Sequence, residues 1–179
     1  EAKNEKQALS QGIVYVSEDR KKEGLVLGMS VAKNVTISSL GRFSKGQLIN
    51  KKQEKESVLH YKDAMRIKTP SLDQSVKLLS GGNQQKVSIA KSLSTQPKIL
   101  IMDEPTRGVD VGAKKEIYEL MNEFKRNGLG ILMISSEIPE LLGVCDRIMV
   151  MSEGQIAGVL SRDKANSNEI MRLAIGAGV

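Results

Sequence analysis

Hydrophobic residues recur along this chain with two spacings, one typical of strands and one typical of helices. Short apolar runs predict strands over 12–17, 99–102 and 130–135. Apolar residues three and four positions apart predict amphipathic helices over 51–66 and 114–126. Further expected elements are a short helix over 31–38 capped by Ser30, a helix over 83–94, a helical turn over 139–142, a hairpin of 147–151 with 155–160, and a closing helix over 168–174.

The order of these elements indicates the fold class. From residue 97 onward strands alternate with helices, which predicts an α/β fold with a mostly parallel sheet. Residues 30–78 are helix-rich and come before that layer, so we expect a helical insertion with its following loop. A chain of 179 residues suits one domain with a core of its own. We therefore expect residues 1–179 to form one domain, in which 79–179 are the C-terminal α/β part.

Composition and charge narrow the function classes. The chain is 40% apolar and 27% charged, as in soluble globular proteins, and no apolar run approaches the roughly 20 residues of a membrane span. The charged N-terminus predicts no signal peptide, and the single cysteine, Cys145, suits a reducing cytoplasm. The net charge is +6, but basic residues are scattered and aromatic residues make up only 3%. We therefore expect no nucleic-acid partner, although a basic surface also suits an anionic membrane leaflet.

Two segments carry candidate chemistry. Ser80-Gly81-Gly82 lies directly before a predicted helix, where free backbone N–H groups and the helix dipole favour an anion. Asp103 and Glu104 end an apolar strand, a position from which carboxylates reach a phosphate-bound Mg²⁺. Each segment alone also has an ordinary interpretation, as a loop and as a pair of surface acids.

In this order, the two segments resemble the signature sequence and the Walker B motif of ATP-binding-cassette (ABC) ATPases. The resemblance implies that Ser80, Gly81, Gly82 and Gln84 contact ATP. It also implies that Asp103 binds Mg²⁺ and that Glu104 is the catalytic general base that orients the attacking water. The segment 107–110 (RGVD) is similar to the family's D-loop, which crosses the interface between two nucleotide-binding domains, and it adds Asp110 to the ATP-binding set.

The chain departs from the family pattern at two positions. Glu18 stands where the family has its Q-loop glutamine; a carboxylate there can still bind Mg²⁺ but adds negative charge, and a solvated surface acid is the alternative. Ser136 stands where the family has a histidine that contacts the γ-phosphate, so Ser136 is the expected ATP contact there. The single histidine, His60, is expected to be exposed on a surface helix.

The sequence contains no P-loop of the form G-x-x-x-x-G-K-[ST]. The segment 41–48 lacks the lysine and the hydroxyl, and 108–114 has the wrong spacing between its glycines. We therefore expect a truncated nucleotide-binding domain that begins after the place of this element. We also expect the isolated chain to be inactive as an ATPase.

A closer resemblance covers nearly the whole chain. The segments 17–25 (SEDRKKEGL), 79–86 (LSGGNQQK), 103–114 (DEPTRGVDVGAK) and 135–140 (SSEIPE) are similar to the second, C-terminal cassette of ATP-binding subunits of bacterial monosaccharide importers, the ribose type in particular. This implies an ATPase that couples ATP hydrolysis to uptake of ribose or a related pentose, bound peripherally at the cytoplasmic face of the inner membrane. The implied partners are membrane permease subunits, a second ABC cassette and, indirectly, a periplasmic sugar-binding protein.

Two other functions stay open. A soluble ABC ATPase of ribosome or DNA metabolism is expected to carry long charged linkers or coiled-coil insertions, and none is visible. A truncated chain can also act as a non-hydrolysing interaction module. Nucleotide binding by the isolated chain distinguishes this module from the enzymes.

Overall fold

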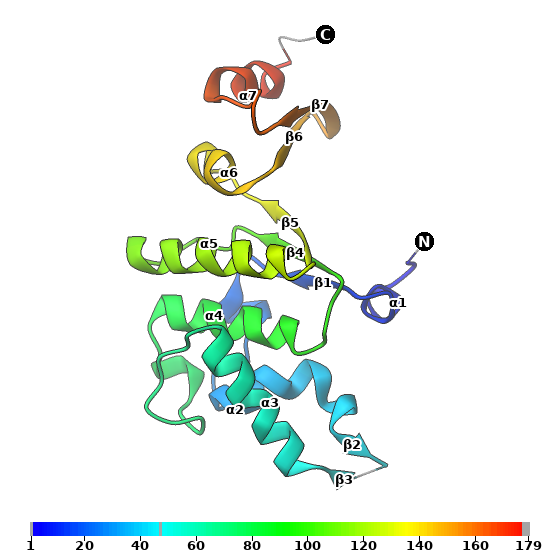
Figure 1. Cartoon of the computed structure of the whole chain (residues 1–179), viewed down its shortest axis with the longest axis vertical. Coiled ribbons are helices and arrows are strands. Elements are labelled where there is room, and N and C mark those ends of the chain that lie inside the picture. Colours follow the sequence, from blue (N-terminus) through cyan, green and yellow to red (C-terminus); the bar gives the residue numbers. More distant parts are fainter. Residues whose placement is uncertain (1, 47, 177–179) are drawn as a thin grey trace. The chain divides into compact units, whose positions relative to one another are not determined.

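The computed structural model describes residues 2–46 and 48–176, and the chain divides into two compact units, 1–134 and 135–179. In the first unit three strands form one sheet, in the order β1 (Ile13–Val16), β4 (Ile99–Asp103), β5 (Gly130–Ile134). Both strand pairs are parallel. The predicted α/β class with a parallel sheet is confirmed (Figure 1).

The two faces of this sheet differ in burial. Val16, Leu100 and Met102 share one face and are buried. Tyr15 and Leu132 lie on the opposite face and are about half exposed, at 53% and 50%. Since side chains alternate between the faces of a strand, only one face of the sheet is covered by the helices of this unit.

Two helices pack on the sheet, α4 (Gly81–Leu93) against β1 and α5 (Val111–Arg126) against β5. α4 begins earlier than predicted because Ser80 is its N-cap. α5 also begins earlier, because Asp110 Oδ1 accepts a hydrogen bond from the N–H of Ala113 at 2.9 Å. The caps, and not the apolar spacing, therefore decide where both helices start.

α4 and α5 come together where glycine leaves room. A Cβ atom built on Gly82 would lie 2.6 Å from the Cβ of Ala113, which real side chains do not tolerate. Residues 84–90 of α4 are all buried, so this helix is nearly enclosed by its neighbours. The contact at Gly82 therefore sets how closely the two helices approach.

The part of the chain between β1 and α4 is mainly helical. It contains α2 (Val31–Thr36), which Ser30 caps as predicted, and α3 (Lys51–Ala64); both pack against α4. His60 is exposed on α3, as expected. Several elements were not predicted because they are too short to show a periodic pattern: the helix α1 (Glu5–Ser10), the π-helical turn η1 (Arg20–Gly24), the 3₁₀ helices η2 (Ile37–Arg42) and η3 (Val76–Leu78), and the paired strands β2 (Ser44–Lys45) and β3 (Leu48–Ile49).

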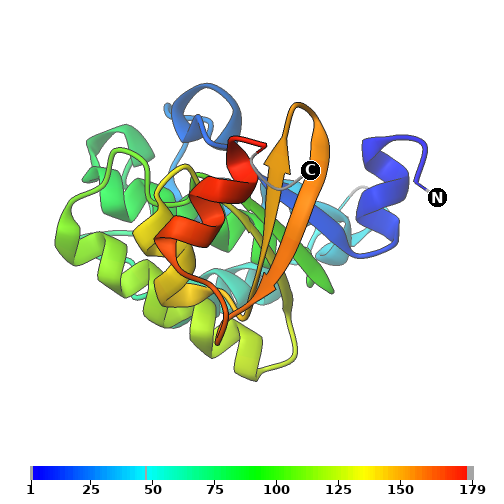
Figure 2. The same cartoon turned by 90° about the horizontal axis from the view of Figure 1, so that it is seen from above.

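The second unit consists of α6 (Ile138–Val144), the strands β6 (Arg147–Ser152) and β7 (Gln155–Ser161), and α7 (Ser167–Ala174). β6 and β7 form the predicted antiparallel hairpin, seen in orange in Figure 2 with α7 in red. Cys145 packs on the apolar core of this unit, which contains Ile148, Val150, Ile170 and Leu173. Among the helices of the described residues, none is both long and apolar enough to cross a membrane.

We predict that Gly82→Ala lowers the free energy of unfolding by about 1–3 kcal/mol, because the added methyl group overlaps Ala113 and forces α4 and α5 apart. Gly41→Ala is the matched control, since a Cβ at Gly41 meets no atom within 4 Å. Urea denaturation of the two variants measures the difference. Equal stability of both would contradict the close contact at Gly82.

Candidate functional site

The acid pair, Asp103 and Glu104, lies at the carboxyl edge of the parallel sheet, where β4 ends. Both residues are half-buried. Asp103 Oδ2 accepts a hydrogen bond from the hydroxyl of Tyr15 at 2.7 Å, and the N–H of Glu104 donates to the carbonyl of Ile134 at 2.9 Å. The pair is therefore held from both sides, by β1 and by the end of β5.

The contact of Tyr15 with Asp103 was not predicted. Tyr15 pairs with Ile101 in the sheet, so Asp103 is its diagonal neighbour on the same face, within reach of an aromatic side chain. The hydrogen bond to Asp103 is the main cause that raises the pKa of Tyr15, with smaller contributions from burial and from the negative charge of Asp103. Tyr15 therefore stays a hydrogen-bond donor and fixes one oxygen of the Asp103 carboxylate.

The donor set at this edge suits Mg²⁺ bound together with a nucleotide. Mg²⁺ at such sites takes one or two carboxylates and completes its shell with phosphate oxygens and water. Within residues 2–46 and 48–176, no three or more His, Cys, Asp or Glu side chains gather as a ready metal site. Asp103 thus fits the role of a single carboxylate ligand, with Glu104 beside it.

Glu104 has an unusual backbone conformation, with φ of 43° in the left-handed region. Residues with a Cβ rarely adopt this region, and such strain concentrates at functional sites. The conformation belongs to the turn after β4, in which the N–H of Arg107 donates to the carbonyl of Glu104 at 3.0 Å. The turn therefore holds Glu104 at an energetic cost.

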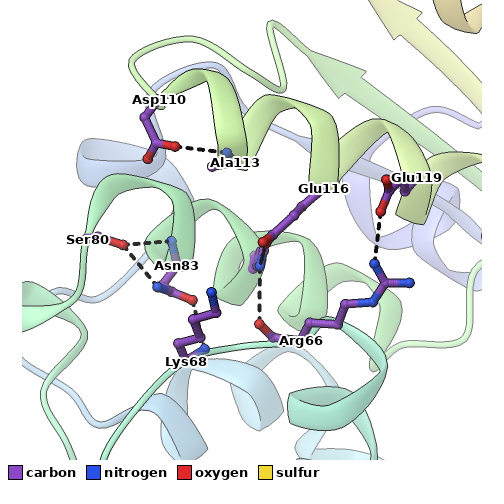
Figure 3. Close-up of polar contacts among 9 residues, drawn as sticks. Arg66, Lys68, Ser80, Asn83, Asp110, Ala113, Glu116 and Glu119 are labelled. Carbon is purple, nitrogen blue, oxygen red and sulfur yellow. Dashed lines mark hydrogen bonds and ion pairs between the residues drawn. The ribbon is translucent and has the colours of Figure 1, made fainter.

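The signature turn, Ser80-Gly81-Gly82, begins α4 with an exposed Ser80. Ser80 Oγ accepts hydrogen bonds from the backbone N–H of Asn83 at 3.4 Å and from Asn83 Nδ2 at 3.0 Å. Asn83 Oδ1 in turn accepts from the N–H of Lys68 at 2.8 Å, which fixes the amide orientation (Figure 3). Both hydrogen bonds are donated by Asn83, so neither uses the hydroxyl proton of Ser80, and this exposed hydroxyl suits an anion.

The glycines of the signature turn have tight neighbours inside the protein. Gly82 is buried against Ala113, and a Cβ at Gly81 would lie 3.0 Å from both Arg20 Nη2 and the carbonyl oxygen of Gly108. Packing therefore opposes a side chain strongly at Gly82 and less strongly at Gly81, whether or not the backbone N–H groups also meet ATP as the sequence predicts.

Gln84 differs from its predicted role. Its side chain is buried, and Nε2 donates to the carbonyls of Val76 at 3.2 Å and Leu79 at 3.1 Å. These bonds hold the loop that leads into Ser80. The side chain therefore supports the signature turn from behind and is not turned toward solvent, where a nucleotide would bind.

Glu18 and Arg20 both contact the segment 107–110. The carboxylate of Glu18 forms an ion pair with the guanidinium of Arg107, and both side chains are partly exposed. Arg20 is buried and donates to the carbonyls of Arg107 at 2.8 Å and Gly108 at 3.1 Å. The loop after β1 is therefore tied to the turn after Glu104, a link that the sequence did not indicate.

A shallow hollow lies between the first turns of α4 and α5 (Figure 3). Asp110 and Ser80 both line it, so the structure brings these two predicted site residues together. The lining of the hollow carries charges of both signs. The buried Lys86 forms an ion pair with Glu116, and its hydrogen bond lowers the pKa of the Glu116 carboxyl. The complete lining is Lys68, Ser80, Gly82, Asn83, Lys86, Asp110, Gly112, Ala113 and Glu116.

Ser136, the remaining predicted site residue, lies in the second unit. It is exposed and stands between the end of β5 and the start of α6. The first unit alone therefore brings together the acid pair with Tyr15, and the signature turn with Asp110.

Known proteins resemble this chain along most of its length. The family model for ABC transporters matches residues 1–107. The ribose import ATP-binding protein RbsA of Clostridium perfringens (strain SM101 / Type A) is 57% identical over 170 residues, which cover 94% of this chain and 34% of that protein. The chain thus spans about a third of the length of this relative.

Two solved structures share the fold. An ATP-binding cassette of an ABC transporter, MJ1267, matches with a TM-score of 0.76 and 23% identity over 93% of this chain and 70% of that chain. The ATP-binding cassette MJ0796, in a dimeric structure with ADP and Pi, matches with a TM-score of 0.73 and 18% identity over 89% and 67% of the two chains. At these identities the likeness concerns the fold alone.

We predict that Glu104→Gly is more stable than Glu104→Ala by about 1 kcal/mol, because only glycine adopts the positive φ of this turn without steric cost. Both variants lack the carboxylate, so lost side-chain contacts cancel in the comparison. Thermal or urea denaturation gives the two free energies of unfolding. A more stable alanine variant would show that the turn is not strained.

Proposed function

Because this chain belongs to the ABC transporter family, we propose that it is the C-terminal part of the ATP-hydrolysing subunit of a bacterial sugar importer. The identity of 57% to a ribose import ATP-binding protein supports ribose or a related pentose as the transported sugar. The observation that carries the proposal is the acid pair at the carboxyl edge of the parallel sheet, in one unit with an exposed, Ser-capped helix N-terminus.

In this proposal the chain's residues have separate roles in hydrolysis. Asp103 binds Mg²⁺, which offsets the charge of the phosphates, while Tyr15 fixes one oxygen of the Asp103 carboxylate. Glu104 orients and polarises the attacking water as general base. The Ser80 hydroxyl donates a hydrogen bond to the terminal phosphate of ATP, together with backbone N–H groups of the α4 N-terminus.

The signature turn and the acid pair then serve two different ATP sites. We propose that Ser80, Gly81 and Gly82 close over ATP held by a second cassette, with Asp110 near that interface. Asp103 and Glu104 serve the site of this cassette, with Glu18 beside the phosphates. This second site gains the negative charge of Glu18, and the sequence has Ser136 where the family pattern has a histidine. We therefore expect it to hydrolyse ATP more slowly than the first.

The partners in this proposal are membrane permease subunits, the second cassette and, indirectly, a periplasmic sugar-binding protein, at the cytoplasmic face of the inner membrane. The loop 18–25 and the helical part that follows it form the proposed permease surface. Lys22 and Val26 support this placement, because both are exposed at the entry to that part. Cysteines introduced there are suitable crosslinking positions.

For the isolated chain, a non-hydrolysing interaction module is the second candidate function, because residues 1–179 contain no P-loop motif. We predict that the isolated chain shows no micromolar binding of Mg-ATP, because the amides and the lysine of a P-loop supply most phosphate contacts. Titration calorimetry with Mg-ATP measures this. A micromolar Kd would show that the chain holds a nucleotide site of its own and would remove the reason for this second candidate.

The importer proposal is tested on the full-length subunit, reconstituted in proteoliposomes with its permease and sugar-binding protein. We predict sugar-stimulated ATPase activity that Ser80→Arg nearly abolishes, since the arginine side chain blocks the competent site. Glu104→Gln should leave a larger residual rate, because it disables the slower site. That site is expected to be slower because it lacks the histidine contact, and losing one transition-state contact typically costs on the order of 10²–10³ in rate.

The matched control is Ser167→Arg, which adds the same side chain at an exposed position of α7. Equal damage by Ser80→Arg and Glu104→Gln would contradict the proposed division between the two sites. Absence of any sugar-stimulated activity would contradict the importer proposal itself.

A further inference from the structure

Arg20 is a buried cation held by main-chain carbonyls. It belongs to the π-helical turn η1, its exposed fraction is 8%, and its Nη1 and Nη2 atoms donate to the consecutive carbonyls of Arg107 and Gly108. Burial lowers the pKa of Arg20, as expected for a charge removed from water. The buried Arg20 guanidinium needs both carbonyls to stay in place, because a buried charge that loses its hydrogen-bond partners strongly destabilises the fold.

The segment that Arg20 holds has a conformation suited to this contact. Gly108 has φ of 67°, in the left-handed region that glycine adopts without a steric penalty. The carbonyls of Arg107 and Gly108 thereby reach two nitrogens of one planar guanidinium, a fork geometry that lysine does not provide. The turn therefore depends on arginine for both of its carbonyl contacts.

The signature turn meets the same guanidinium. A Cβ at Gly81 would lie 3.0 Å from Arg20 Nη2 and 3.0 Å from the carbonyl oxygen of Gly108. At the other end of the side chain, a Cβ at Gly24 would lie 3.3 Å from Arg20 Cβ and 2.9 Å from Ser88 Oγ of α4. Gly24 therefore lies between Arg20 and Ser88 of α4, and the Arg20 guanidinium lies beside both the segment 107–110 and Gly81 of the signature turn.

A second link joins two of these segments at the surface. The ion pair of Glu18 with Arg107 is 38% and 69% exposed at its two side chains. Exposed pairs contribute little and are screened by salt. The buried contacts of Arg20 are therefore the ones that fix the geometry.

We propose that Arg20 is a positioning residue that makes the signature turn and the turn carrying Glu104 move as one body. The N–H of Arg107 donates to the carbonyl of Glu104, so a restraint on Arg107 acts directly on the turn of the acid pair. The inference rests on the proposed function, in which Ser80 and Glu104 serve different ATP sites. Through Arg20, closure of the signature turn over one nucleotide sets the position of Glu104 at the other.

The first test is hydrogen exchange on this chain with Arg20→Lys, which keeps the charge but reaches only one carbonyl. The amides of Arg107 and Val109, which donate to the carbonyls of Glu104 and Thr106, should exchange at least about tenfold faster, while β4 amides keep their rates. Lys21→Ala, at the exposed neighbouring residue, is the control and should change neither. Unchanged exchange at Arg107 and Val109 in Arg20→Lys would overturn the proposal.

A measurement on the unmodified chain covers the case in which Arg20→Lys does not fold. In NMR spectra, the guanidinium N–H groups of Arg20 should exchange with water at least about tenfold more slowly than those of the exposed Arg107, because Arg20 is buried and bonded to two carbonyls. Equal exchange for the two side chains would overturn the proposal.

The second test is the ATPase activity of the full-length subunit. Arg20→Lys should lower kcat by about tenfold or more and leave the KM for ATP within threefold, since positioning and not binding is lost. An unchanged kcat in the presence of faster exchange would overturn the coupling role. If the unmodified subunit has no ATPase activity, the proposed function fails, whereas the exchange result still decides whether Arg20 joins the two turns.

Discussion

The burial of α4 is the constraint on which the first unit depends. This helix packs against β1, α2, α3 and α5, and yet it carries polar residues through its enclosed part. Each buried polar group needs a partner, because an unpaired one costs about 1–3 kcal/mol. Nε2 of Gln84 donates to two backbone carbonyls, while its Oε1 is buried without a hydrogen-bond partner among the described residues, and Lys86 is bonded to the carbonyl of Arg66 and the carboxylate of Glu116. These bonds fix the rotation of α4 and thereby the place of Ser80.

From this helix the candidate site extends in two directions. At its N-terminus, Asn83 is fixed by the N–H of Lys68 and donates to the hydroxyl oxygen of the exposed Ser80. Across the first unit, Arg20 approaches Gly81 at the start of α4 and donates to two carbonyls of the turn that follows the acid pair. The signature turn and the turn after the acid pair are thus connected through packed backbone and the Arg20 guanidinium. This connection needs no ligand shared by the two turns. This explains why glycine occurs at Gly81, where a side chain would meet Arg20.

The acid pair shows how a parallel sheet prepares charge at its edge. Asp103 is held by a hydroxyl from β1, and Glu104 by its N–H to the end of β5 and by a strained turn. Both residues stand at the carboxyl ends of the strands, which is where ligands bind in sheets of this kind. Preorganisation of this type contributes to catalysis because the protein does not reorganise during the reaction.

The sequence by itself determined the elements with local signals and the residues of the motifs. The strands 99–102 and 130–135, the amphipathic helix over 114–126 and the hairpin around Glu153 and Gly154 follow from apolar spacing and turn residues within a few positions. The tertiary structure alone decided the contacts of Tyr15 with Asp103 and of Arg20 with Arg107 and Gly108, which join residues 87 or 88 positions apart. It also turned Gln84 inward. These outcomes depend on strand register and on how closely helices approach, and local periodicity contains no information about either.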